Sequence, residues 1–213
     1  MMKRRVTTQA TRLRAGVLAL AGLCTAIAFA NDGEHKEATE PHQTIDAHQT
    51  AAQKRQFSEL VRIVHDATAK YQNVHDAESA GYKLQFGCVT GGEFGAMGLH
   101  YVKDELTGDD VLDPENPEIV IYEPTPHGPP RLIGADFLIL KSVWEANPKH
   151  TKPPQLRGQL LHLFDEPNRF KLPAFYTLHV WAWKPNPAGS FVNWHTNVSC
   201  DSFFDDSDAG AGL

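Results

Sequence analysis

The stretch Phe175-Tyr-Thr-Leu-His-Val-Trp-Ala-Trp183 is the most regularly patterned part of this 213-residue chain. Aromatic and β-branched residues of this kind favour an extended strand. Side chains in a strand alternate between the two faces of a sheet. One face of this strand would carry the residues Tyr176, Leu178, Val180 and Ala182, and the other would carry Thr177, His179, Trp181 and Trp183. We therefore predict a strand over Phe175–Trp183 with a histidine beside two tryptophans.

Further strands are predicted on both sides of this stretch. Residues of alternating character span Tyr82–Cys88 and Met97–Val102, and short apolar runs span Ile119–Tyr122 and Leu132–Leu140. The turn-forming sequence Asn186-Pro-Ala-Gly189 favours an antiparallel return over Phe191–Val198. Together these segments predict five or six short strands, most of them antiparallel.

Helical periodicity appears before the strands, from Ala51 onward. Apolar side chains recur there every three or four residues, at Phe57, Leu60, Val61, Val64, Ala67 and Tyr71. The pattern resumes after Gln72-Asn73 and stops at Gly81, so it predicts one amphipathic helix or two shorter ones. A short helix is also predicted over Gln155–Phe164. The fold class is therefore α+β, with an N-terminal amphipathic helix packed on a curved, mainly antiparallel sheet.

The two ends of the chain have a different composition from the centre. Residues 1–30 combine a basic start with an apolar stretch that ends Ala28-Phe29-Ala30, which is typical of a signal peptide cut after Ala30. We predict a disordered linker at 31–50 that carries His35, His42 and His48, a single globular domain at 51–204, and an acidic flexible tail at 205–213. The protein would be exported to the periplasm or the extracellular space.

Charge excludes two classes of partner. The signal peptide holds five of the 20 basic residues and none of the 26 acidic ones, so the mature chain has a net charge of −11. An acidic surface repels nucleic acid and anionic membranes. The expected partner is a small ligand or a metal ion, without membrane association after cleavage, and the sequence leaves the oligomeric state open.

Two cysteines stay in the mature chain, because Cys24 belongs to the predicted signal peptide. Cysteines of exported proteins usually pair, so we predict a Cys88–Cys200 disulfide. The alternatives are metal ligation by thiolates and a reactive thiol.

Three longer stretches carry a family resemblance. They are Gly95-Ala-Met-Gly-Leu-His-Tyr-Val102, Leu112-Asp-Pro-Glu-Asn-Pro-Glu-Ile-Val-Ile-Tyr-Glu-Pro124 and Leu172-Pro-Ala-Phe-Tyr-Thr-Leu-His-Val-Trp-Ala-Trp-Lys-Pro-Asn-Pro-Ala-Gly189, closed by Val198-Ser-Cys200. Over about Tyr82–Cys200 the chain resembles a family of small secreted bacterial proteins of unassigned function. The resemblance implies a secreted single domain and supplies no activity, ligand or catalytic residue.

Histidines and carboxylates on the predicted strands form the candidate site. His100 and His179 would face one cavity if their strands are neighbours, and Glu123 and Asp136 each fall on an otherwise apolar strand face. A buried carboxylate needs a partner such as a histidine, an arginine or a metal ion. We predict a divalent transition metal, Zn or Cu, held by His100, His179 and Glu123, with His195 as a further candidate ligand. The predicted lining residues are Trp181, Trp183, Asp136 and Tyr101.

Function is predicted only as a class. The sequence favours an exported small-ligand-binding protein that binds such a metal. One alternative is an exported hydrolase or lyase with a histidine–carboxylate acid–base pair and no metal. The other alternative is a structural or interaction module. The motifs HExxH, GxSxG and CxxCH do not occur, so the sequence lacks the signatures of common zinc proteases, esterases and c-type cytochromes.

Overall fold

An antiparallel sheet dominates the computed structural model, which describes residues 50–203. Within this range six strands are hydrogen-bonded in the order β1-β2-β3-β4-β8-β7. They are β1 Lys83–Thr90, β2 Ala96–Val102, β3 Ile119–Glu123, β4 Arg131–Leu140, β7 His162–Phe164 and β8 Phe175–Val180. The predicted signal peptide, the linker up to residue 49 and the tail at 205–213 lie outside the described residues.

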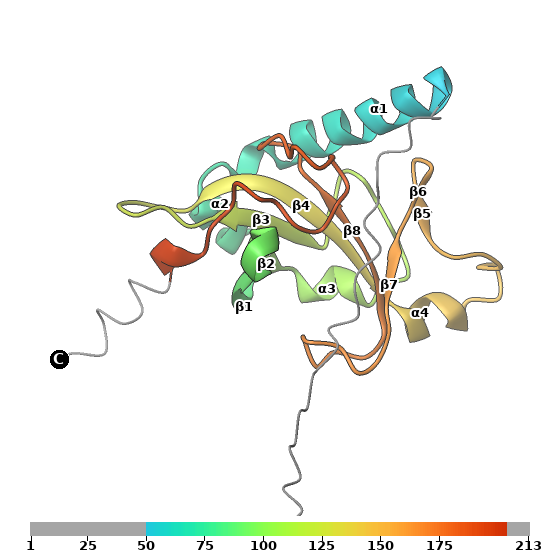
Figure 1. Cartoon of the computed structure of the whole chain (residues 1–213). Helices are drawn as coiled ribbons and strands as arrows, with labels where there is room; N and C mark the ends of the chain where they lie inside the picture. Colours follow the sequence, from blue (N-terminus) through green and yellow to red (C-terminus); the bar gives the residue numbers. More distant parts are fainter. Residues whose placement is uncertain (1–49, 204–213) are drawn as a thin grey trace, which may run out of the picture. The chain divides into compact units, whose positions relative to one another are not determined.

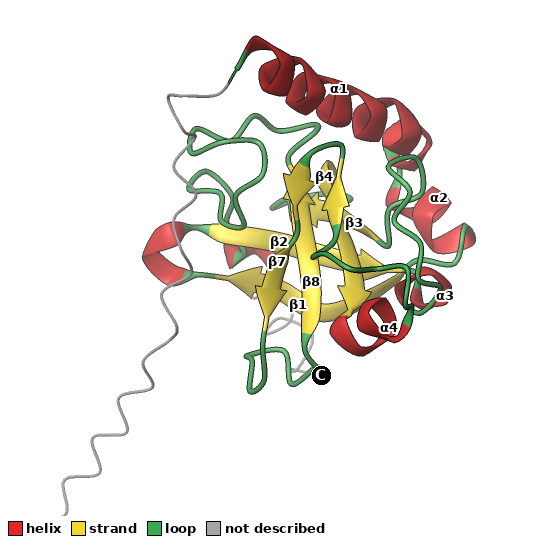
Figure 2. Ribbon diagram, turned by 90° about the vertical axis from the view of Figure 1, so that its right-hand side faces the viewer, coloured by secondary structure: helices red, strands yellow, loops and turns green. Residues whose placement is uncertain are grey.

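The sheet is strongly curled (Figure 2). The β1–β2 register shifts between Gln85 and Cys88, and the β3–β4 register shifts between Ile121 and Tyr122. Irregularities of this kind bend strands and increase their twist. Gly98 permits the close approach of β2 to β3, because its φ is +98° and a Cβ there would lie 2.5 Å from the Tyr122 carbonyl oxygen. The predicted α+β fold with a curved sheet is confirmed.

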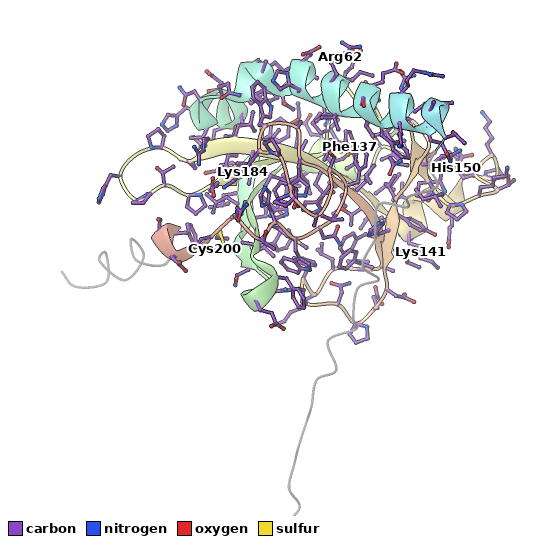
Figure 3. All side chains as sticks on the ribbon, turned by 45° about the horizontal axis from the view of Figure 1, so that its top comes forward. Arg62, Phe137, Lys141, His150, Lys184 and Cys200 are labelled. Carbon is purple, nitrogen blue, oxygen red and sulfur yellow. A yellow bond between two sulfur atoms is a disulfide. The ribbon has the colours of Figure 1, made fainter. Side chains whose placement is uncertain are left out.

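Helix α1, Ala51–Thr68, lies across β4 and β8 (Figure 1). It begins with a capping box in which Thr50 Oγ1 accepts a hydrogen bond from the Gln53 backbone N–H. Leu60 and Val64 are fully buried against the apolar outer face of the sheet, which carries Phe137, Ile139 and Leu178. Figure 3 shows Arg62 pointing away from the protein and Phe137 in the interior below α1.

The predicted break at Gln72-Asn73 is present. The 3-10 helix η1, Ala69–Tyr71, follows α1, and α2, Val74–Ser79, begins after Asn73, whose side chain accepts from the His75 N–H. Gly81 then turns the chain with a φ of +98°. The Tyr122 hydroxyl donates to the Tyr71 carbonyl at 2.7 Å and so ties η1 to β3.

Short elements complete the described part of the chain. They are η2 Gly92–Phe94, α3 Asp104–Thr107, α4 Lys141–Ala146, and a separate hairpin of β5 Gln155–Leu156 and β6 Gln159–Leu160. None of the helices between residues 50 and 203 is long and apolar enough to cross a membrane.

Three sequence predictions about elements are wrong. The helix predicted over Gln155–Phe164 is instead β5, β6 and β7, because Arg157 and Gly158 adopt positive φ angles and form a tight turn. No strand forms over Phe191–Val198, where only His195 bridges to Ala96. Strand β8 ends at Val180 rather than Trp183, because the Trp181 N–H donates to the Ser190 carbonyl outside the sheet.

The predicted Cys88–Cys200 disulfide is confirmed, with the two Cα atoms 5.7 Å apart. It joins β1 to the segment that follows the last strand, and Figure 3 shows Cys200 at this end of the described chain. Neither sulfur is available as a metal ligand or as a reactive thiol.

Loss of this disulfide is expected to lower the free energy of unfolding by about 4–5 kcal/mol in the chain-entropy account, because the bond closes a loop of 112 residues. The measurement is urea unfolding of the oxidised protein and of the double variant Cys88→Ser, Cys200→Ser. A reductant should destabilise the oxidised protein alone. Equal unfolding midpoints for the two proteins would contradict the expectation.

Glu118 is a buried acid at the end of the β3–β4 ladder. Its side chain is 1% exposed, and its Oε2 accepts a hydrogen bond from the Leu138 N–H at 3.2 Å. Burial raises the pKa of Glu118 to about 9. The folded protein therefore keeps this carboxyl protonated at neutral pH, whereas the unfolded chain ionises it.

The contribution of Glu118 to stability should consequently fall with rising pH. The contribution of Glu118 is complete below its unfolded pKa of 4.5 and is lost as the pH rises toward its folded pKa of about 9. The slope is at most about 1.4 kcal/mol per pH unit. Glu118→Gln removes this dependence, so its free energy of unfolding should rise relative to wild type between about pH 5 and about pH 8.

Urea unfolding at both pH values measures this difference, and the exposed Glu115→Gln is the matched control. A Glu118→Gln difference that stays constant with pH would show that Glu118 is ionised in the folded protein.

Candidate metal centre

Asp136 and His179 face each other across the middle of the sheet. They are directly paired between β4 and β8, and paired residues of antiparallel strands point to the same face. His100 lies on β2, next to β3, and the curl of the sheet brings it to the same place. The rings of His100 and His179 have centroids 5.6 Å apart. One potential ligand atom from each of the three residues lies within 4.8 Å of the other two.

All three side chains are buried, with exposed fractions of 5% for His100, 3% for Asp136 and 2% for His179. Burial lowers the pKa of His100 to about 4 and the pKa of His179 to about 3. Burial also raises the pKa of Asp136 to about 6. Both imidazoles are therefore neutral at neutral pH, which is the form that binds metal ions.

Asp136 is oriented by its neighbours on β8. Its Oδ1 accepts hydrogen bonds from the Thr177 hydroxyl at 2.5 Å and from the Leu178 N–H at 3.1 Å. Its Oδ2 lies 3.4 Å from His179 Nδ1. One carboxylate oxygen is thus fixed in place, while the other faces the histidines.

The two imidazoles differ in their hydrogen bonds. His100 Nδ1 lies 3.1 Å from the Gly98 carbonyl, to which its N–H donates, so Nε2 is left for a ligand. Metal-binding histidines commonly carry such an outer contact. His179 is buried with neither ring nitrogen hydrogen-bonded to any described residue. An imidazole in this state is costly, and a bound metal ion would satisfy one of its two nitrogens.

Glu123 does not belong to this group. It lies at the end of β3, where its carboxylate binds Arg131 Nη2 at 2.8 Å and Lys184 Nζ at 2.5 Å. The carboxylate that the structure brings to His100 and His179 is Asp136, which the sequence analysis placed only in the lining. Strand alternation put both acids on an apolar face, and the register between strands decides which of them meets the histidines.

His195 and Trp181 border the group. The Trp181 ring lies 5.8 Å from the His179 ring and 4.9 Å from the His195 ring, measured between centroids. Trp181 therefore lies near both histidines, and His195 is not among the three residues whose ligand atoms lie within 4.8 Å of one another. His195 is fully buried, and its Nδ1 accepts from the Asn197 N–H at 3.1 Å. The structure thus places Trp181 beside the site, and the predicted ligand His195 does not belong to the group of three.

The other predicted lining residues lie elsewhere. Trp183 stacks on His65 of α1, with ring centroids 3.7 Å apart, because the chain has left the sheet after Val180. The Tyr101 ring packs on Tyr122, with centroids 5.1 Å apart. Tyr101 follows His100 directly in β2, so it points to the opposite face of the sheet.

Sequence reasoning missed His162, the first residue of β7. It is paired with Thr177 on β8, and its Nε2 is buried without a hydrogen-bond partner among the described residues. Because the segment was predicted to be a helix, His162 was not considered as a strand residue near the site. The available signal was a single histidine within the apolar run Leu160-Leu-His-Leu-Phe164.

The geometry defines a buried site of two histidines and one aspartate on the inner face of a curled antiparallel sheet. Comparison with family models, with curated proteins and with solved structures gives no match for this chain. The resemblance to small secreted bacterial proteins therefore stays a prediction.

Replacement of His179 by leucine should stabilise the metal-free protein by about 1–3 kcal/mol, because it removes a buried imidazole that has no hydrogen bond to any residue from 50 to 203. The matched variant His100→Leu should be destabilising, because it leaves the Gly98 carbonyl without its donor. Urea unfolding with a chelator present measures both. A loss of stability in His179→Leu equal to that in His100→Leu would mean that His179 has a structural role.

Proposed function

We propose that this protein is an exported binding protein for a divalent transition metal ion, held by His100, Asp136 and His179. The observation that carries the proposal is His179, a buried imidazole that has no hydrogen bond to any described residue and whose ligand atom lies within 4.8 Å of those of His100 and Asp136. A set of two neutral imidazoles and a carboxylate suits Zn, and it also suits Cu.

Each residue has a distinct role in this proposal. His100 offers Nε2, because its Nδ1 is engaged with the Gly98 carbonyl. Asp136 offers Oδ2, because Thr177 and Leu178 hold Oδ1. These outer contacts fix the donor atoms before the ion arrives, so little conformational entropy is lost on binding.

Burial favours binding over catalysis. The 3.4 Å approach of His179 Nδ1 to Asp136 Oδ2 and the raised pKa of Asp136 support the alternative of an acid–base enzyme. A general base near neutral pH needs a pKa close to the working pH and contact with the substrate. The pKa of His179, about 3, does not meet the first condition, whereas the pKa of Asp136, about 6, does. Neither residue meets the second condition, because their exposed fractions are 2% and 3%.

Export is supported by the disulfide and by the predicted signal peptide. Disulfides such as Cys88–Cys200 persist in the periplasm and outside the cell and are rare in the cytosol. The protein would therefore capture its metal ion in an oxidising compartment.

Elemental analysis of the full exported chain, purified without a polyhistidine tag, tests the function. We expect about one zinc or copper ion per chain, held by a single centre. His179→Ala and Asp136→Ala should lose the ion. The sequence also contains His35, His42 and His48, so a variant with all three replaced by serine is the matched control and should keep the ion.

Absence of metal from wild type, even after soaking with zinc and copper, would refute the function. Retention by His179→Ala, together with loss from the control, would move the site to residues 31–50.

A further inference from the structure

A third imidazole faces the same interior as the metal centre. His162 is paired with Thr177, and residues paired in this way share a face of the sheet. The Thr177 hydroxyl reaches Asp136 Oδ1 on that face. His162 therefore lies on the inner face with His100, Asp136 and His179.

The position of His162 in the sheet puts it close to His179. The two residues are diagonal neighbours on adjacent strands β7 and β8, a relation that separates Cα atoms by about 7–8 Å. His100 is further away in strand order, because β3 and β4 lie between β2 and β8. Burial lowers the pKa of His162 while the charge of Asp136 raises it, so the imidazole lies within electrostatic reach of Asp136.

Two features would allow His162 to become a ligand, namely the state of its ring nitrogen Nε2 and its place on an edge strand. Its Nε2 is buried without a hydrogen-bond partner among the described residues. The group of three whose ligand atoms lie within 4.8 Å of one another does not include it, so its imidazole must move inward to join them. Strand β7 is a three-residue edge strand paired on one side only, which makes such a shift easy.

We propose that His162 is the fourth protein ligand and that metal binding draws its imidazole inward to complete a three-histidine, one-aspartate site. This inference rests on the proposed function. Zinc sites with four protein ligands are closed, whereas catalytic zinc sites keep one position for water. The protein would therefore sequester its ion, with zinc as the preferred metal, and would leave no position for a substrate.

X-ray absorption spectroscopy of the zinc-loaded full chain tests the ligand set. The expected result is three imidazoles in wild type and two in His162→Gln. In chelator competition the zinc affinity of His162→Gln should fall at least about 100-fold, because the loss of outer contacts alone costs about 10–100-fold. Leu163→Gln is the matched control on the same strand. Leu163 is 45% exposed, so its replacement should change neither reading.

Thermal unfolding with a chelator present checks that each variant is folded. If His162→Gln does not fold, His162→Leu fills the same interior space without a nitrogen and gives the same two readings. Two imidazoles in wild type, or an unchanged count and affinity in the His162 variant, would overturn the inference and leave the proposed function intact. Absence of zinc from wild type would refute the proposed function itself.

Discussion

The curl of the six-stranded sheet is the constraint on which the core and the site both depend. Strands of a sheet lie about 4.8 Å apart, so a flat sheet would hold β2 and β8 about 14 Å from each other. The rings of His100 and His179 on these strands are 5.6 Å apart. Register shifts in β1–β2 and β3–β4 provide the bend, and Gly98 lets β2 approach β3 without a steric clash.

The two faces of this sheet bury different kinds of side chains. The outer face packs against α1 through Leu60, Val64 and Phe137, which are fully buried apolar residues. The inner face buries an aspartate and two histidines that this packing does not need. Polar groups in such a place cost stability unless a partner satisfies them, and natural proteins accept this cost mainly at functional sites.

Local pattern in the sequence predicted the elements, whereas contacts between distant residues decided the site. Period-two alternation found β2 and β8 and put His100 and His179 on strands, and the cysteine count with the predicted export signal predicted the disulfide. Alternation could not choose between Glu123 and Asp136, because the choice depends on the register between β3, β4 and β8. The helix predicted over Gln155–Phe164 is why His162 was not considered, because the turn at Arg157 and Gly158 is set by backbone angles that the sequence pattern does not reveal.

The position of the disulfide has a consequence for the unfolded chain. Cys88 and Cys200 close a covalent ring, and His100, Asp136, His162 and His179 all lie within its sequence. Unfolding of the oxidised protein cannot move these four donors further apart than the ring allows. A single cut in any connecting loop between the two cysteines would likewise leave all four in one covalently joined molecule.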